Sequence, residues 1–285
     1  MICCIGHITH DRVITPEFTS EMPGGTAYYF AKALNGIAPG KFRIVTAVGN
    51  DELTAAEQLK REGVLIDILP SRKSVFFENK YGENKDERTQ RVLAKADPFS
   101  VEMVKDLKAD YIHLGTLLAD DFDLEVIKYL STKGKVSVDI QGYLRRVVGE
   151  EVIHQDYAQK REAMRYISIL KANEQEMEVL TGSSDPLTAA RILSDWGCEE
   201  VVLTFGSKGS LVRSHGENHV IPAYPTTRII DTTGCGDTYM AGYLYRRNEG
   251  DDIDSAGRYA AAMCSLKLSC KGPLTARPED ISMFI

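Results

Sequence analysis

Short apolar runs alternate with segments of helical spacing along most of the chain. The runs are rich in aliphatic and β-branched residues, and most of them end near a glycine or an aspartate, which is typical of buried strands. The strands expected from this pattern are 2–5, 42–48, 111–114, 136–140, 167–170, 201–205 and 210–212, and the helices are 25–34, 52–62, 121–130, 185–196, 236–247 and 254–269. Elements that alternate in this way form parallel βαβ units. The sequence therefore predicts an α/β fold, a doubly wound, mostly parallel sheet with helices on both faces.

The segment around residues 74–92 departs from this rhythm. Residues 74–79 and 88–92 have the composition of extended strands, and the stretch 80–87 between them is polar. The simplest interpretation of that stretch is a solvated hairpin turn. Two strands inserted between βαβ units could form a small flap that excludes water from a reacting phosphate. No long linker or repeat divides the chain, so we expect a single domain over residues 1–285.

Composition argues against several classes of partner. The chain has 41 acidic and 34 basic residues and a net charge of −7, whereas nucleic acid and anionic membranes require a basic face. We therefore expect neither as the main partner. No run of 18 apolar residues is present, and the N-terminal segment lacks the basic start and apolar length of a signal peptide. These features favour a cytoplasmic protein.

The six cysteines have no spacing typical of zinc ligands, so a structural metal is not expected. Cys3 and Cys4 lie in an apolar run and are expected in the core. Free thiols suit a reducing compartment. Cys235 lies in a glycine-rich turn and could be taken for a nucleophile, but its position requires a small side chain and its neighbours suggest that the backbone acts there.

That glycine-rich turn, Asp231-Thr-Thr-Gly-Cys-Gly-Asp237, leads directly into the helix expected over 236–247. A turn of this kind directs several backbone N–H groups at one point, with the positive end of the helix dipole behind them. Such a point suits an anion. Asp237 would not by itself favour an anion, and the simplest explanation is catalysis, in which amides hold a phosphoryl group while Asp237 takes a proton from an attacking hydroxyl. The alternative is an ordinary N-cap.

Several stretches resemble one family, the PfkB or ribokinase-like carbohydrate kinases. Residues 231–237 resemble its D-T-x-G-A-G-D signature, with Cys235 in place of alanine. Further resemblances lie in its substrate-binding elements (6–11 and 24–25), its G-x-V-G-x-D turn (46–51, with Thr46 for the first glycine), its N-x-x-E motif (173–176) and its nucleotide-side strand-turn-strand (201–211). The matches follow the family's order from residue 2 to about residue 273.

The resemblance implies a ribokinase-like domain with a small β lid, formed here by segments near 12–22 and 72–94. It also implies transfer of the ATP γ-phosphoryl group to an alcohol of a small sugar or polyol. Asp237 would be the general base. The amides of Gly234, Cys235 and Gly236 would form the anion hole.

The same resemblance assigns the donor side. Asn173 and Glu176 would organise Mg²⁺ and phosphate through water, as hard oxygen ligands suit this ion. Thr204, Gly206 and Gly209 lie where the nucleotide should pass. Asn173 has a purely structural alternative, because it could N-cap a helix with Glu176 completing a capping box.

The remaining positions concern a monovalent cation and the acceptor. Asp231 and Thr233 match positions that bind a monovalent cation such as K⁺ beside the anion hole in many family members. Asp11, Gly24 and Gly25 would contact the hydroxyls of the substrate.

Two departures from the family pattern bear on the acceptor. Tyr29 stands where many sugar kinases have the asparagine of G-G-x-x-x-N, and in place of D-x-N-x-R the chain has Gln141 near the asparagine position and Arg145 offset by two residues. Residues 6–11, 91–98 and 138–141 look more like the myo-inositol kinase branch. A polyol presents several hydroxyls with which Asp11, Gln141 and Arg145 could form hydrogen bonds.

Other interpretations remain open at this point. A nucleoside or vitamin-precursor kinase of the same superfamily would share the Asp237 site. A non-catalytic sugar-binding protein would be expected to lack Asp237 or the glycine-rich turn, and both are present. A Rossmann dehydrogenase would need G-x-G-x-x-G after its first strand, which this chain lacks. An exposed lid edge could pair with a second copy to form a homodimer.

Overall fold

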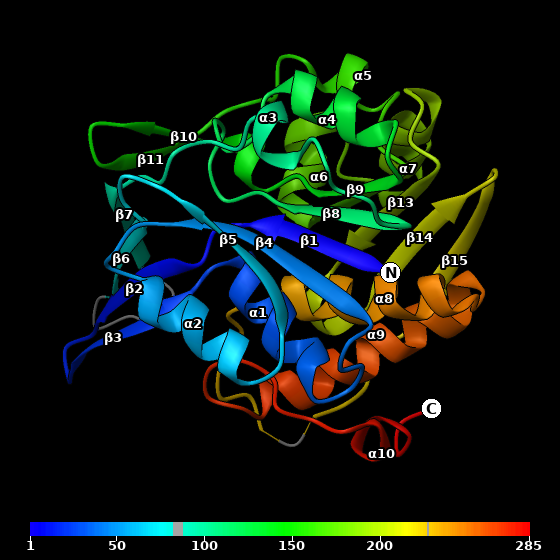
Figure 1. Cartoon of the computed structure of the whole chain (residues 1–285). Helices are drawn as coiled ribbons and strands as arrows, with labels where there is room; N and C mark the ends of the chain where they lie inside the picture. The colour runs from blue at the N-terminus through cyan, green and yellow to red at the C-terminus, as the bar shows by residue number, and fades with distance from the viewer. Residues whose placement is uncertain (82–87, 227) are drawn as a thin grey trace.

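The computed structural model describes residues 1–81, 88–226 and 228–285. Its main sheet has nine strands, with the edges at β15 and β5 and with β1 third from the β5 edge (Figure 1). In spatial order these are β15 (Glu217–Ile221), β14 (Ser210–Ser214), β13 (Glu200–Thr204), β12 (Ile169–Asn173), β9 (Lys135–Asp139), β8 (Tyr111–Gly115), β1 (Ile2–Gly6), β4 (Phe42–Val48) and β5 (Leu65–Pro70).

The strands from β13 to β5 are parallel, and β14 and β15 add two antiparallel strands at one edge. The order reverses at β1, where Ile2 lies opposite Phe42 of β4 on one side and Tyr111 of β8 on the other. All five residues of β1 are buried, because helices cover both faces of the sheet. A reversal of this kind opens a crevice beyond the carboxyl ends of the strands.

Each face of the main sheet has its own layer of helices and its own apolar core (Figure 1). One layer consists of α1 (Thr26–Asn35), α2 (Leu53–Arg61), α8 (Cys235–Glu249), α9 (Ile253–Leu268) and α10 (Pro278–Ile281). The other consists of α3 (Val101–Val104), α4 (Leu124–Ser131), α5 (Lys160–Ala163), α6 (Glu174–Thr181) and α7 (Pro186–Asp195), and two short 3₁₀ helices span Gly142–Leu144 and Gly206–Lys208. This arrangement confirms the predicted doubly wound, mostly parallel α/β fold.

A second sheet lies beyond the carboxyl end of β1. Its strands, in spatial order, are β10 (Arg145–Val148), β11 (Glu151–His154), β7 (Arg88–Ala94), β6 (Val75–Tyr81), β2 (Thr9–Ile14) and β3 (Thr19–Gly24). Two residues, His7 and Ile8, separate β1 from β2, so the two sheets are joined by a very short connection.

The second sheet is larger than the segments expected from the sequence. The hairpin of β10 and β11 was not anticipated, because its strands have four residues each and are mostly exposed, which leaves little apolar signal. The polar turn expected over 80–87 lies largely outside the described residues. Within the described part of the chain, no helix combines the length and the apolar character that crossing a membrane requires.

Candidate active site

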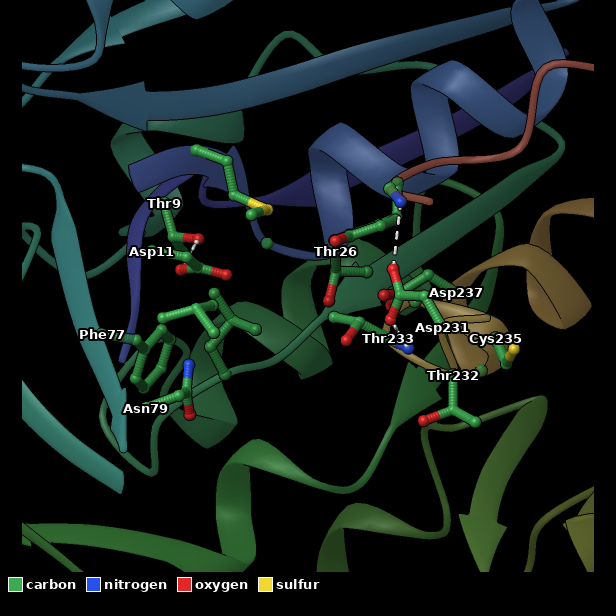
Figure 2. A pocket seen from close by; sticks show the side chains of 18 of the residues that line it. Thr9, Asp11, Thr26, Phe77, Asn79, Asp231, Thr232, Thr233, Cys235 and Asp237 are labelled. Carbon is green, nitrogen blue, oxygen red and sulfur yellow. Dashed lines mark hydrogen bonds between the residues drawn. The ribbon is translucent and has the colours of Figure 1, made fainter. Parts of the chain in front are cut away.

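A cavity of about 740 Å³ lies between the second sheet and the carboxyl ends of the main-sheet strands. Figure 2 shows Asp11 and Asn79 from the second sheet on one side of it, and Asp231 and Asp237 on the other. The sequence-predicted residues that line it are Asp11, Gly25, Gln141, Arg145, Asn173, Thr204, Asp231, Thr233, Gly234, Cys235, Gly236 and Asp237. One cavity thus brings together residues spread over more than two hundred positions of the chain.

The N-terminus of α8 forms one wall of this cavity. Gly234 is the N-cap of the helix and has φ +75°, a left-handed conformation that favours glycine. A Cβ at this position would come within 2.2 Å of the Tyr29 ring, so the close approach also requires glycine. The helix has 15 residues, so the dipole at its N-terminus is well developed.

The amides of this first turn differ in how they are used. The N–H of Cys235 donates to the backbone oxygen of Thr232 at 3.2 Å. In the described part of the chain, the N–H groups of Gly234, Gly236 and Asp237 have no such acceptor. Two of the three amides that the sequence suggested, together with the amide of Asp237, are therefore available to an anion.

Asp237 lies in the first turn of α8, next to these amides. Burial raises the pKa of its carboxyl group to about 6, and the charge of Asp139 adds to this rise. Lys171, a hydrogen bond from Thr26 and Arg145 act in the opposite direction. A carboxylate with this pKa is ionised at pH 7 and is a stronger base than an ordinary aspartate, which suits proton abstraction.

A buried cluster of ionic side chains, Lys171, Asp139 and Glu176, lies behind this wall of the cavity. Nζ of Lys171, in the middle of β12, lies 2.9 Å from Oδ2 of Asp139 and 3.8 Å from Oε2 of Glu176. Burial disfavours the charged form of Lys171, but the two carboxylates outweigh it and raise its pKa. A Cβ on Gly236 would lie 3.1 Å from Nζ, so the ammonium group stands directly beside the first turn of α8.

Sequence reasoning missed Lys171 and the role of Asp139. The available signal was a lysine inside an otherwise apolar strand, Ile169-Leu-Lys-Ala-Asn173. A charge in such a strand is rarely buried without a partner. Its partner, Asp139, comes from the end of the neighbouring strand β9, which sequence alone does not reveal.

The opposite wall of the cavity carries polar groups from the second sheet. Thr9 donates to Asp11 at 2.7 Å on β2, and burial raises the pKa of Asp11 to about 6 (Figure 2). Nε2 of Gln90 donates to Oδ1 of Asn79 at 2.9 Å across the β6–β7 pair. The remaining amide donor of Asn79 and the amide oxygen of Gln90 are therefore able to bind hydroxyls. Sequence reasoning did not identify this pair.

Asn173 has the capping role suggested for it and also reaches the cavity. It caps α6, where its side chain accepts from the N–H of Glu176 at 2.9 Å, and the Glu176 carboxylate accepts from the N–H of Asn173 at 2.7 Å. This reciprocal pair confirms the predicted capping box. Asn173 also lines the cavity, beside Thr204 at the end of β13.

Four of the sequence-predicted residues lie outside the described cavity lining: Gly24, Glu176, Gly206 and Gly209. Gly24 lies behind Asp11, since a Cβ there would come within 2.2 Å of Oδ2 of that carboxylate. Gly209 has φ +91°, and its Cβ would meet the backbone oxygen of Ile221 at 2.2 Å. Each of these two glycines makes room for a neighbouring group rather than reaching into the cavity.

Glu176 does not fit a direct metal site. Oε2 accepts from the backbone of Asn173, and Oε1 accepts from Asn173 Nδ2 at 2.8 Å and Gln141 Nε2 at 3.3 Å. No cluster of three His, Cys, Asp or Glu residues in the described segments could hold an ion. Mg²⁺ is commonly held by water and substrate phosphates with few protein ligands, so any role of Glu176 would pass through water.

Asp231 is held by its own neighbours before the turn into α8. Oδ1 accepts from the N–H of Thr233 at 2.9 Å, and Oδ2 accepts from the N–H of Gly272 at 3.0 Å. Although burial opposes it, these amides and the nearby Lys267 lower the pKa of Asp231.

Known proteins resemble this chain over nearly its whole length. A cytidine kinase of Thermococcus kodakarensis is 29% identical over 268 residues, which cover 89% of this chain and 91% of that one. A pyrophosphate-dependent kinase in the ribokinase family has the same fold, with a TM-score of 0.88 and 26% identity over 100% of both chains. Such a kinase in complex with a pyrophosphate analog and myo-inositol gives a TM-score of 0.86 and 25% identity, over 99% of this chain and 100% of that one.

The model of the pfkB family carbohydrate kinases matches residues 1–280. This match covers the Asp231–Asp237 turn, the cavity and both sheets, and it confirms the family that the sequence motifs predicted. The chain belongs to the pfkB family of carbohydrate kinases.

Proposed function

We propose that this protein is an ATP-dependent kinase that transfers the γ-phosphoryl group to a hydroxyl of a small sugar or polyol. The observation that carries the proposal is the position of Asp237, a carboxylate with a pKa of about 6 beside free amides at the N-terminus of α8. The amides attract a phosphoryl group, and the carboxylate accepts the proton of an attacking alcohol.

The transfer then proceeds by an in-line displacement. The acceptor oxygen forms a bond to the γ-phosphorus, and the bond from that phosphorus to the bridging oxygen breaks with its electron pair remaining on ADP. The hydroxyl proton passes to Asp237. In phosphoryl transfer the protein mainly positions the reactants and stabilises the developing charge. The amides of Gly234 and Gly236 would stabilise that charge.

The polar wall that the second sheet contributes to the cavity favours a polyhydroxylated acceptor. Asp11, Asn79 and Gln90 present donors and acceptors from three strands of the second sheet. Gln141 and Arg145 line the cavity as well. A similar kinase binds myo-inositol, which agrees with the polyol character of this lining.

A nucleoside is the second candidate acceptor. The cavity is also lined by the rings of Phe18, Tyr29, Phe77 and Tyr81, and aromatic rings can pack against a base. The similar chain from Thermococcus kodakarensis is a cytidine kinase.

There are also two candidates for the phosphate donor. ATP is the donor that the family motifs imply, whereas the kinase with a TM-score of 0.88 is pyrophosphate-dependent. With pyrophosphate, the same displacement would release orthophosphate in place of ADP.

A panel of two donors and five acceptors tests the proposal. Purified protein with Mg²⁺ would be given ATP or pyrophosphate and myo-inositol, ribose, fructose, adenosine or cytidine, with phosphorylated products identified by ³¹P NMR. We expect acceptor-dependent consumption of ATP with a polyol or sugar. The Asp237→Asn variant should still bind the acceptor but lose a factor of about 10²–10⁴ in kcat.

Each other result has a definite meaning. Phosphorylation of nucleosides alone would replace the polyol by the second candidate, and turnover with pyrophosphate alone would replace ATP. A kcat of Asp237→Asn near that of the unchanged protein would exclude Asp237 as the base.

A further inference from the structure

A buried lysine lies behind the loop that leads into α8. Lys267, the penultimate residue of α9, is 0% exposed. Its Nζ donates to the backbone oxygen of Asp231 at 3.0 Å and lies 3.4 Å from Oδ2 of the same residue. Taking an ammonium group out of water costs several kcal/mol unless other oxygens replace the water. The two oxygens of Asp231 provide that replacement.

The same loop is anchored to the end of α9 by its backbone. The N–H of Ile230 donates to the oxygen of Leu268 at 2.7 Å, and Oδ2 of Asp231 accepts from the N–H of Gly272. Three residues later, Gly234 begins α8 with its available amides. Lys267 therefore holds the loop that sets the direction of those amides.

The oxygens of Asp231 are already occupied. The backbone oxygen accepts from Lys267, Oδ1 accepts from Thr233, and Oδ2 faces both Lys267 and the N–H of Gly272. A monovalent cation held by Asp231 and Thr233 would need such carbonyl and carboxylate oxygens as ligands. The donor set found here is filled by N–H groups and one ammonium group, and it does not fit a further ion.

We infer that the ammonium group of Lys267 replaces the monovalent cation expected at this loop, so that phosphoryl transfer by this protein does not depend on K⁺ or Na⁺. The inference rests on the proposed kinase function. Lys267 acts as a positioning residue, because it contacts Asp231 rather than the cavity.

The charge of Lys267 also reaches the first turn of α8. Burial raises the pKa of the Cys235 thiol, and Lys267 is the strongest influence that opposes the rise. A positive charge behind Cys235 adds to the positive end of the helix dipole, which is what an anion in front of the amides requires.

The first test needs no variant. Kinase activity of the unchanged protein would be measured with the acceptor found in the panel, in KCl, NaCl and tetramethylammonium chloride at equal ionic strength. We expect rates that agree within about threefold, which is well below a tenfold change in rate. A larger stimulation by K⁺ or Na⁺ would overturn the inference. If no acceptor is phosphorylated in any salt, the proposed function fails instead.

The second test removes the ammonium group with Lys267→Met. In tetramethylammonium chloride we expect a loss of about tenfold or more in kcat, because a charge behind the anion hole is missing. K⁺ should restore most of this loss by entering the freed position. No loss, or a loss that K⁺ does not reverse, would contradict the replacement.

The matched control is Lys128→Met on α4, whose Nζ forms ion pairs at 2.9 Å with Glu125 and Glu162 on the other face of the main sheet. It should respond to no cation. Should Lys267→Met fail to fold, the comparison of salts with the unchanged protein decides the question.

Thermal unfolding gives a readout that does not depend on turnover. An ion that binds only the native state raises the unfolding temperature with its concentration. K⁺ in place of tetramethylammonium should raise that temperature for Lys267→Met and leave it unchanged for the unmodified protein and for Lys128→Met. Stabilisation of the unmodified protein by K⁺ alone would show a second cation site and overturn the inference.

Discussion

Asp237 lies between opposing electrostatic influences. Burial and the charge of Asp139 raise the pKa of its carboxyl group to about 6, while Lys171 and Arg145 limit the rise. The result is a base that is ionised at neutral pH but holds a proton more strongly than a solvated aspartate. The basicity of Asp237 therefore depends on residues from several strands.

This pKa predicts the acid side of the pH profile. Because the base must be deprotonated, kcat/KM should fall about tenfold per pH unit below about pH 6 and stay level just above it. Asp11 has a similar pKa of about 6 and could produce the same limb. A profile measured for Asp11→Asn separates the two: the limb should persist, and its disappearance would assign it to Asp11.

Lys171→Met should destabilise the fold strongly. The change leaves the buried carboxylates of Asp139 and Glu176 without their cation, which typically costs about 3–5 kcal/mol in free energy of unfolding at pH 7. Burial raises the pKa of Glu176, so the loss should shrink as the pH falls through that pKa and the carboxylate is protonated.

Urea unfolding at several pH values measures this loss. Lys128→Met serves as control, because its ion pairs are partly exposed and such pairs contribute about 0–1 kcal/mol. A loss for Lys171→Met that is equally small, or one that grows as the pH falls, would contradict the ion cluster.

The residues that could be predicted from the sequence are those whose role depends on their neighbours in the chain. Asp237 and the glycines before it form one short turn, so their shared role follows from local backbone geometry. Asn79, Gln90 and Lys171 were missed for the opposite reason. Asn79 meets Gln90 through strand pairing, and Lys171 meets Asp139 through a parallel neighbour, and neither register is visible in the residues alone.

At the scale of elements, α8 has a left-handed glycine at each end. Gly234 is its N-cap with φ +75°, and Gly250 is its C-cap with φ +98°. A Cβ at Gly234 would collide with the Tyr29 ring, whereas a Cβ at Gly250 would meet nothing within 4 Å. The two positions share a backbone conformation but differ in their surroundings.

Substituting alanine at each end of α8 separates the effect of backbone strain on stability from an effect on catalysis. Both variants should lose roughly 1–2 kcal/mol of stability, the usual cost of a left-handed L-residue, and Gly234→Ala should lose more because its Cβ would collide with the Tyr29 ring. Gly234→Ala should in addition lose kcat by about tenfold or more, because a displaced amide no longer faces the phosphoryl group. Gly250→Ala should keep its kcat. Equal kcat values in the two variants would exclude a catalytic role for the N-terminus of α8.

Element prediction succeeded where the apolar pattern was long. The central strands and the helices that cover them were placed within a few residues, because each buries a continuous stripe or run. The strands β5, β10, β11 and β15 were not predicted, since they are short and expose many of their side chains. Burial supplies the apolar pattern, and these strands have little burial.

At the scale of the whole molecule, the two sheets contribute different residues to the lining of the cavity. The main sheet and α8 provide Asp237 and the amides, and the second sheet provides Asp11, Asn79 and Gln90. This division predicts that the reaction and the choice of acceptor can be altered separately.

Asn79→Leu tests this division. The change removes an amide that can bind a hydroxyl, so the KM for the acceptor should rise by about tenfold or more while the KM for the donor stays the same. Steady-state kinetics with each substrate varied in turn measures both. An equal rise in the two KM values would contradict the division between the sheets.

The anchoring of the loop before α8 has a consequence for how the protein is made. Lys267, Leu268 and Gly272 hold that loop, and they follow every strand of both sheets in the chain. Synthesis proceeds from the N-terminus, at about 5–20 residues per second. A growing chain can thus complete its two sheets before the contacts that fix the anion hole exist. The ability to transfer a phosphoryl group would be among the last properties that the nascent protein acquires.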